Sequence, residues 1–101
     1  MLKNFRTYQL AVQFYQLTQS VKLPRQLSDQ LKRAASSIAL NLAEGAGRFS
    51  KDDTRRFFHI AFGSLRECQA ILDLAPKQYS EVSAAADILG ANLYRLLNPK
   101  E

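Results

Sequence analysis

The sequence has very few of the residues that build disulfides and zinc sites. Among 101 residues, Cys68 is the only cysteine and His59 the only histidine. A single cysteine excludes an intramolecular disulfide, and these two residues cannot supply the usual Cys and His ligands of a zinc site. We therefore expect no metal and no cofactor, and we interpret Cys68 as a small apolar core residue.

Long apolar runs are also missing. No stretch approaches the roughly 20 consecutive apolar residues of a membrane-spanning helix. The first ten residues, MLKNFRTYQL, contain neither the apolar segment nor the small-residue cleavage site of a signal peptide. We therefore expect a soluble, cytoplasmic protein that does not associate with membranes.

Glycine and proline are scarce, at 4 and 3 residues, which favours helices over a turn-rich sheet. Apolar residues recur at helical spacing in four segments, approximately 4–20 or 6–20, 25–44, 51–75 and 80–97. The connections are short, so consecutive helices should be antiparallel neighbours. We predict an all-α fold, an antiparallel up-and-down four-helix bundle that forms a single domain over residues 1–101.

Each predicted helix has an inward-facing stripe. These stripes comprise Phe5, Tyr8, Ala11, Val12 and Tyr15; Leu27, Leu31, Ala34, Ile38 and Leu42; Phe57, Ala61, Leu65, Cys68 and Leu72; and Val82, Ala86, Leu89, Leu93 and Leu96. Ser50 should cap the third helix, with Asp53 three residues further on. Gly45 and Gly47 should end the second helix by adopting left-handed geometry, an interpretation that we prefer to a phosphate-binding loop because the Lys-Ser/Thr ending is missing.

The second predicted helix has an unusual outer face. The run from Ala34 to Ala43 contains no charge, although the outer face of a surface helix is normally solvated. We predict that copies of the chain meet there to form a homo-oligomer. The predicted interface residues are Ser36, Ala39, Leu40 and Ala43. The alternative is an exposed, alanine-rich face that reflects helix propensity alone.

A polar stripe lies beside the core stripe of the same helix. We interpret it as a structural network, in which Arg33 pairs with Glu67 because partly buried charges need partners. The predicted members are Arg33, Ser37, Asn41, Glu44 and Glu67. Gly63 and Ser64 should allow the third helix to pack closely. Contact with a ligand is the alternative role for this stripe.

Charge is distributed unevenly along the chain. Residues 1–66 contain eleven basic and four acidic residues, a net charge of +7, whereas residues 67–101 carry a net charge of −2. Such asymmetry favours a polyanionic partner, nucleic acid first, and the alternative of equal weight is a basic face that is only solvated. The predicted nucleic-acid-binding residues are Lys32, Arg48, Lys51, Arg55, Arg56 and Arg66.

Candidates for catalysis are few. His59, Glu44 and Glu67 are the residues that suggest acid–base chemistry, and His59 falls on the outer face of its helix with Arg55 and Arg66. No nucleophile is paired with a base, so we expect that the protein is not an enzyme.

The segment 30–72 contains many positions of a recognisable pattern. They are Gln30, Leu31, Arg33, Ala34, Ser36, Ser37, Ile38, Asn41, Ala43, Glu44, Gly45, Gly47, Arg48, Ser50, Asp53, Arg56, Phe57, Ile60, Ala61, Gly63, Ser64 and Glu67. At these positions the chain resembles the four-helix-bundle proteins encoded in intervening sequences of bacterial 23S ribosomal RNA genes, and their relatives. The sequence departs from the pattern at Ala39, where relatives often have proline, in the short connection 22–26 and in the segment 68–70.

The resemblance implies an up-and-down bundle, a ring-shaped homopentamer and no enzymatic activity. It also implies binding of nucleic acid, partly through likeness to the basic pentameric accessory protein of diversity-generating retroelements, which cooperates with a reverse transcriptase. We therefore expect an oligomeric nucleic-acid-binding protein. The alternative is a scaffold or accessory protein that binds a partner protein.

Overall fold

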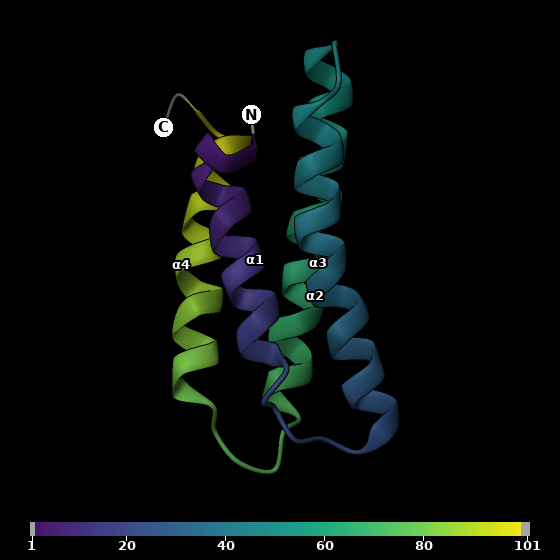
Figure 1. Ribbon diagram of the computed structural model, residues 1–101, viewed down its shortest axis with the longest axis vertical. Coiled ribbons are helices and arrows are strands. Elements are labelled where there is room, and N and C mark those ends of the chain that lie inside the picture. The colour runs from purple at the N-terminus through teal and green to yellow at the C-terminus, as the bar shows by residue number, and fades with distance from the viewer. Residues whose placement is uncertain (1, 100–101) are drawn as a thin grey trace.

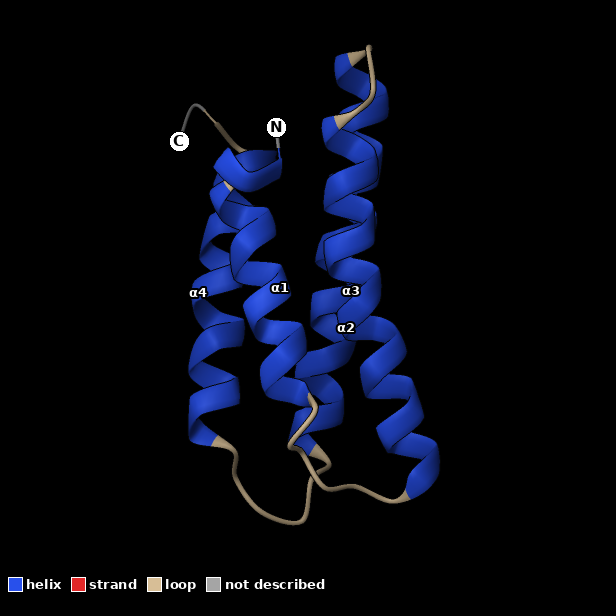
Figure 2. Ribbon diagram, in the orientation of Figure 1, coloured by secondary structure: helices blue, strands red, loops and turns tan. Residues whose placement is uncertain are grey.

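The computed structural model describes residues 2–99. A short 3-10 helix, η1 (Leu2–Asn4), precedes four α-helices: α1 (Arg6–Thr18), α2 (Arg25–Ala46), α3 (Lys51–Asp73) and α4 (Ser80–Leu97). Consecutive helices run in opposite directions (Figure 1), and helices with short loops account for the whole of the described chain (Figure 2). The predicted all-α, antiparallel up-and-down bundle is therefore confirmed.

The helices α2 and α3 are longer than their neighbours. They contain 22 and 23 residues, compared with 13 in α1 and 18 in α4. The α2–α3 hairpin consequently extends beyond the ends of α1 and α4 (Figure 1). At the opposite end, the backbone N–H of Lys22 donates to the hydroxyl of Tyr79 over 2.9 Å, which links the α1–α2 and α3–α4 connections.

All four helices contribute to one core. Phe14, Ile38, Leu65 and Leu89 are fully buried and represent α1 to α4 in turn. Nearly all the predicted stripe residues of α2, α3 and α4 are buried or packed against this core. Their spacing of three and four residues places them on one side of each helix, which explains this agreement.

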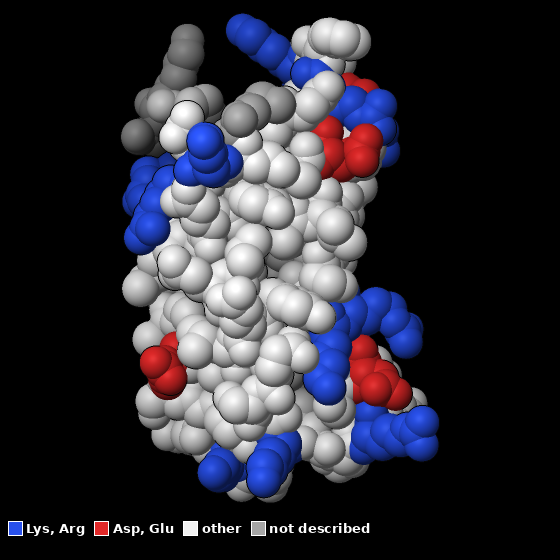
Figure 3. Space-filling view, viewed as in Figure 1, with Lys and Arg blue, Asp and Glu red and all other residues white. Residues whose placement is uncertain are grey.

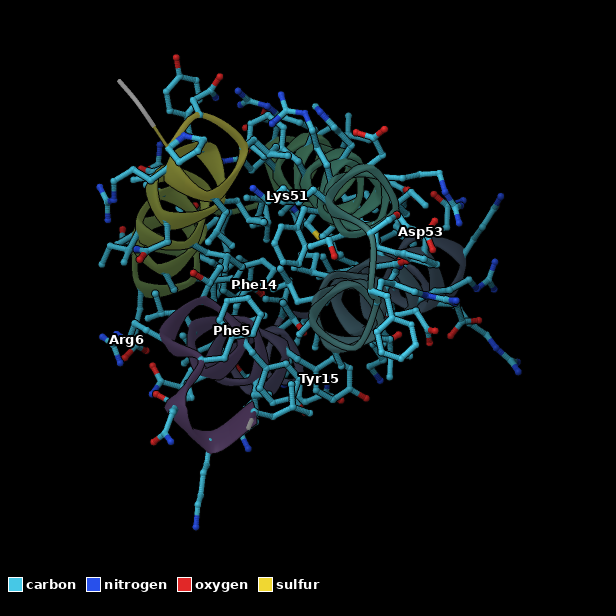
Figure 4. The ribbon with its side chains drawn as sticks, turned by 90° about the horizontal axis from the view of Figure 1, so that it is seen from above. Phe5, Arg6, Phe14, Tyr15, Lys51 and Asp53 are labelled. Carbon is cyan, nitrogen blue, oxygen red and sulfur yellow. The ribbon has the colours of Figure 1, made fainter. Side chains whose placement is uncertain are left out.

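The predicted inner stripe of α1 is confirmed only in part: Ala11 is buried and Phe5, Tyr8 and Tyr15 pack against the core, but other residues form the centre of the inward face. The buried residues are Thr7, Leu10, Ala11, Phe14 and Thr18, whereas Phe5, Tyr8, Val12 and Tyr15 remain partly exposed. Figure 4 shows Phe14 directed into the bundle and Tyr15 at its edge. The hydroxyl of Thr18 donates to the carbonyl of Tyr15 over 2.6 Å, so this side chain can be buried without leaving an unsatisfied donor.

The glycines at the end of α2 have a different role from the one predicted. The helix continues to Ala46, Gly47 follows with φ −94°, and no residue of 2–99 has a positive φ. Gly45 is buried within α2 against α3. A Cβ atom there would lie 2.8 Å from Cε1 of Phe58 and 3.1 Å from Cβ of Phe57. Gly45 therefore permits close packing of two helices, not a left-handed turn.

The predicted cap of α3 is confirmed. The Ser50 hydroxyl accepts a hydrogen bond from the backbone N–H of Asp53 over 3.0 Å. The hydroxyl of Thr54 also donates to the carbonyl of Gly45 over 3.0 Å, which fixes the start of α3 against the end of α2.

Candidate nucleic-acid interface

The structure separates the six predicted nucleic-acid-binding residues into two groups. Four of them, Arg48, Lys51, Arg55 and Arg56, surround the connection between α2 and α3, which we call the tip (residues 47–56). Lys32 and Arg66 lie about 20 Å further down α2 and α3, given the helical rise of about 1.5 Å per residue. Figure 3 shows basic side chains at two levels of the side formed by α2 and α3, each with acidic side chains beside them, and uncharged surface between the two levels.

Two arginines of the tip are already paired with acidic side chains. Arg48 lies 2.6 Å from Glu44 and 3.8 Å from Asp53, and Arg56 lies 3.0 Å from Asp53. Both guanidinium groups also stack on the ring of Phe57, at 4.7 and 4.5 Å from its centroid. The tip contains four basic and two acidic side chains, and Glu44 pairs with Arg48 from outside it, so part of its positive charge is neutralised.

Two further members of the predicted set also have partners. Arg55 donates to the carbonyl of Leu97 and so joins α3 to the end of α4. Arg66 donates to Gln69 over 3.2 Å, and its guanidinium lies 4.9 Å from the ring centroid of Phe62. Lys32 and Lys51 are exposed, and within residues 2–99 neither forms an ion pair.

The first half of α2 carries a cationic surface of which sequence reasoning identified only Lys32 as a nucleic-acid-binding residue. Arg25, Lys32 and Arg33 are all exposed, and among the described residues none of them is paired with an acidic side chain. We call these three residues the α2 cationic patch. Asp29 lies between them and is the one acidic residue of this half of the helix. Their spacing of seven and eight residues places them on one side of α2, which is the sequence signal that could have identified the patch.

Part of the predicted polar network forms between α2 and α3. The hydroxyls of Ser37 and Ser64 lie 2.9 Å apart, and the Asn41 amide donates to the carbonyl and hydroxyl of Ser37 over 2.8 and 3.0 Å. Glu44 pairs with Arg48 of its own helix end.

Other expectations for this network do not hold. Arg33 and Glu67 are both exposed, and in the described part of the chain they do not pair with each other. Each lies on the solvated side of its helix, where water replaces the partner that a buried charge would need. Gly63 is exposed, with no neighbouring atom within 4 Å of the position of a Cβ, so it does not mediate the packing.

The predicted interface residues differ in how much of their surface their own chain covers. Leu40 is 67% exposed, and Ser36 and Ala43 are partly exposed. We call Ser36, Leu40 and Ala43 the α2 outer face. Ala39 is also partly exposed, and the rest of its surface packs against the core of its own chain.

His59, one of the catalytic candidates, and Cys68, the expected core residue, differ in their exposure. His59 is exposed on α3, whereas Cys68 is fully buried. Burial and the neighbouring charge of Glu67 raise the pKa of the Cys68 thiol to about 12. The thiolate required of a nucleophile is therefore almost absent near neutral pH.

The comparison with known families agrees with this architecture. The family model described as 23S rRNA-intervening sequence protein matches residues 5–92, which extend from the residue before α1 into the last third of α4. The chain belongs to this family. The family resemblance inferred from segment 30–72 is therefore confirmed, and the match covers parts of all four helices. No curated protein matches the sequence. Within residues 2–99, no helix combines the length and the apolar character needed to cross a membrane.

Proposed function

We propose that the protein is a non-enzymatic homo-oligomer, a pentamer as the family resemblance implies, that binds nucleic acid through a basic surface. The observation that carries this proposal is the α2 cationic patch, where Arg25, Lys32 and Arg33 are exposed and have no acidic partner among the described residues. Exposed cations bind phosphates and release condensed counterions, which drives association with nucleic acid of almost any sequence.

Assembly would multiply this surface. The α2 outer face continues directly from the cationic patch along the same side of the helix, and Leu40 is the most prominent apolar side chain on it. Contact between copies through Leu40 and Ala43 would remove apolar surface from water. Each added copy would also add the three cations of its own patch, so that the assembly binds one long polyanion at several points.

The proposal is tested with two variants that remove equal charge. The triple variant R25Q/K32Q/R33Q changes the α2 cationic patch, and R48Q/K51Q/R56Q changes the tip. Because both variants lose three positive charges, a difference between them reports local contact rather than net charge. Binding is measured by fluorescence anisotropy with a labelled RNA of about 16 nucleotides, single-stranded and as a duplex, at about 50 and 200 mM salt.

We expect the α2 variant to bind RNA at least about tenfold more weakly than the wild type. The slope of the logarithm of the binding constant against the logarithm of the salt concentration should also become about 2 less steep, since each phosphate contact contributes about 0.7–0.9 to it. The tip variant should retain more affinity because Arg48 and Arg56 are already neutralised. Wild-type protein that binds neither form of RNA at low salt would contradict the nucleic-acid function.

The second candidate function is a scaffold that binds a partner protein. Leu74 and Ile88 favour it, since they are 65% and 53% exposed and lie outside the α2 outer face. An intact oligomer that does not bind nucleic acid would favour this alternative.

A further inference from the structure

Phe49 is the most exposed large apolar side chain of the described residues. It lies in the tip, between Arg48 and the capping residue Ser50, and its ring is fully accessible to solvent. The ring adds nothing to the core, and a polar residue in this connection would avoid the exposed apolar surface. An aromatic side chain held in this position therefore suggests a function in contact with another molecule.

A pocket of about 400 Å³ opens beside Phe49. Phe49, Phe58, Leu96 and Pro99 form its apolar lining, and Lys51 and Arg55 stand at the same site together with one acidic residue, Asp52. The hydrogen bond from Arg55 to the Leu97 carbonyl holds the pocket wall to the end of α4. The Ser50 cap fixes the neighbouring start of α3, so the pocket exists before any ligand binds.

We propose that the tip pocket binds an unpaired nucleobase, which stacks on Phe49 while the adjoining phosphates contact Lys51 and Arg55. This inference rests on the proposed nucleic-acid function and adds that single strands are preferred to duplexes. Every nucleobase has an apolar face that stacks on aromatic rings, and proteins that bind single strands combine such rings with nearby cations. The pocket volume falls within the usual range for small ligands.

The position of the tip agrees with a single-stranded ligand. It extends beyond the ends of α1 and α4 (Figure 1), and α4 contributes only its end, through Leu96, to the pocket beside Phe49. Bases inside a duplex are stacked on one another and do not offer their faces to a side chain. Duplexes should therefore contact only the cations.

The test compares substitutions at Phe49 that keep or remove an aromatic face. We expect F49A and F49L to weaken binding of the labelled single-stranded RNA about tenfold, whereas F49W retains wild-type affinity. Binding of a blunt duplex should be the same for all four proteins. A 2-aminopurine placed in the single strand should lose fluorescence with wild type and F49W but not with F49A. L74A, which removes an exposed apolar side chain outside the tip, is the matched control and should have no effect.

Several results would overturn the inference. Full single-strand affinity in F49A, or in F49L, would show that ring stacking is not involved. A change of molecular mass in F49A would assign Phe49 to a contact between copies. Wild-type protein that binds duplex but not single-stranded RNA would refute this inference and leave the proposed function standing, whereas no binding of either form would refute both.

Discussion

The two sides of α2 differ in how much of their surface is covered by other residues of the same chain. On the side facing α3, Ser37 bonds to Ser64, Asn41 bonds to Ser37, and Gly45 packs against the ring of Phe58 and the Cβ atom of Phe57. On the outer side, Leu40 is left 67% exposed within the uncharged run of residues 34–43. An amphipathic helix normally buries one apolar side and solvates the other. The uncharged outer side is the feature on which the proposed contact between copies rests.

The outer side of α2 is itself divided. Its first half presents Arg25, Lys32 and Arg33 to solvent, and its second half presents Leu40 and Ala43. Along the outer side of α2, a charged surface is thus followed by an uncharged one. We infer that the first half serves a polyanion and the second half serves another copy of the chain.

The largest effect should come from placing a charge on the outer side. L40E would bury a carboxylate in the proposed contact, so we expect the dissociation constant of the oligomer to rise at least about 100-fold. The measurement is sedimentation equilibrium. I88E, on α4, is the matched control because Ile88 is exposed to a similar degree, 53%. Equal assembly of L40E and wild type would remove the distinction between the two sides.

A pair of glycine substitutions should separate the close-packed side from open surface. G45A forces a methyl group against Phe57 and Phe58, and we expect it to lower the free energy of unfolding by about 1–3 kcal/mol. G63A meets no neighbour in the chain, so it should raise the free energy of unfolding by about 0.5–1 kcal/mol through helix propensity. Urea unfolding at one fixed protein concentration measures both, since assembly makes stability depend on concentration. Equal destabilisation by the two changes would contradict the role assigned to Gly45.

The smallest effect should come from two serines on α2 and α3. S64A removes the hydroxyl that bonds to Ser37 between helices, which should cost about 1 kcal/mol before the better helix propensity of alanine is counted. S36A removes only a bond to the carbonyl of Arg33 in the same helix, so no loss is expected. In urea unfolding, the free energy of unfolding of S64A should therefore be lower than that of S36A. The opposite order would show that the Ser37–Ser64 bond does not stabilise the α3-facing side.

The sequence was most informative where apolar spacing and chain breaks coincide. Pro24 and Ser50 directly precede α2 and α3, so the sequence predicted the starts of these helices closely. The absence of charge over residues 34–43 was enough to identify the unusual outer face of α2. The inner face of α1 was predicted only in part because two of its buried residues, Thr7 and Thr18, are polar. Their burial depends on hydrogen bonds such as that from Thr18 to Tyr15, which a hydropathy pattern does not contain.

The candidate site was less predictable than the fold. A count of basic residues cannot tell which side chains are neutralised, because pairing depends on the conformations of residues such as Arg48 and Arg56 around Asp53. The exposure of Phe49 was missed for a related reason. It follows from how far the α2–α3 hairpin extends beyond its neighbours, a property of the assembled bundle and not of the local sequence.

The most direct test of the account is the molecular mass of the unmodified protein in solution. Light scattering at micromolar concentration should give a multiple of the 11.4 kDa chain, close to five chains, because copies cover the α2 outer face. A mass of 11.4 kDa at that concentration would show that Leu40 and Ala43 remain open to water, and it would contradict the account.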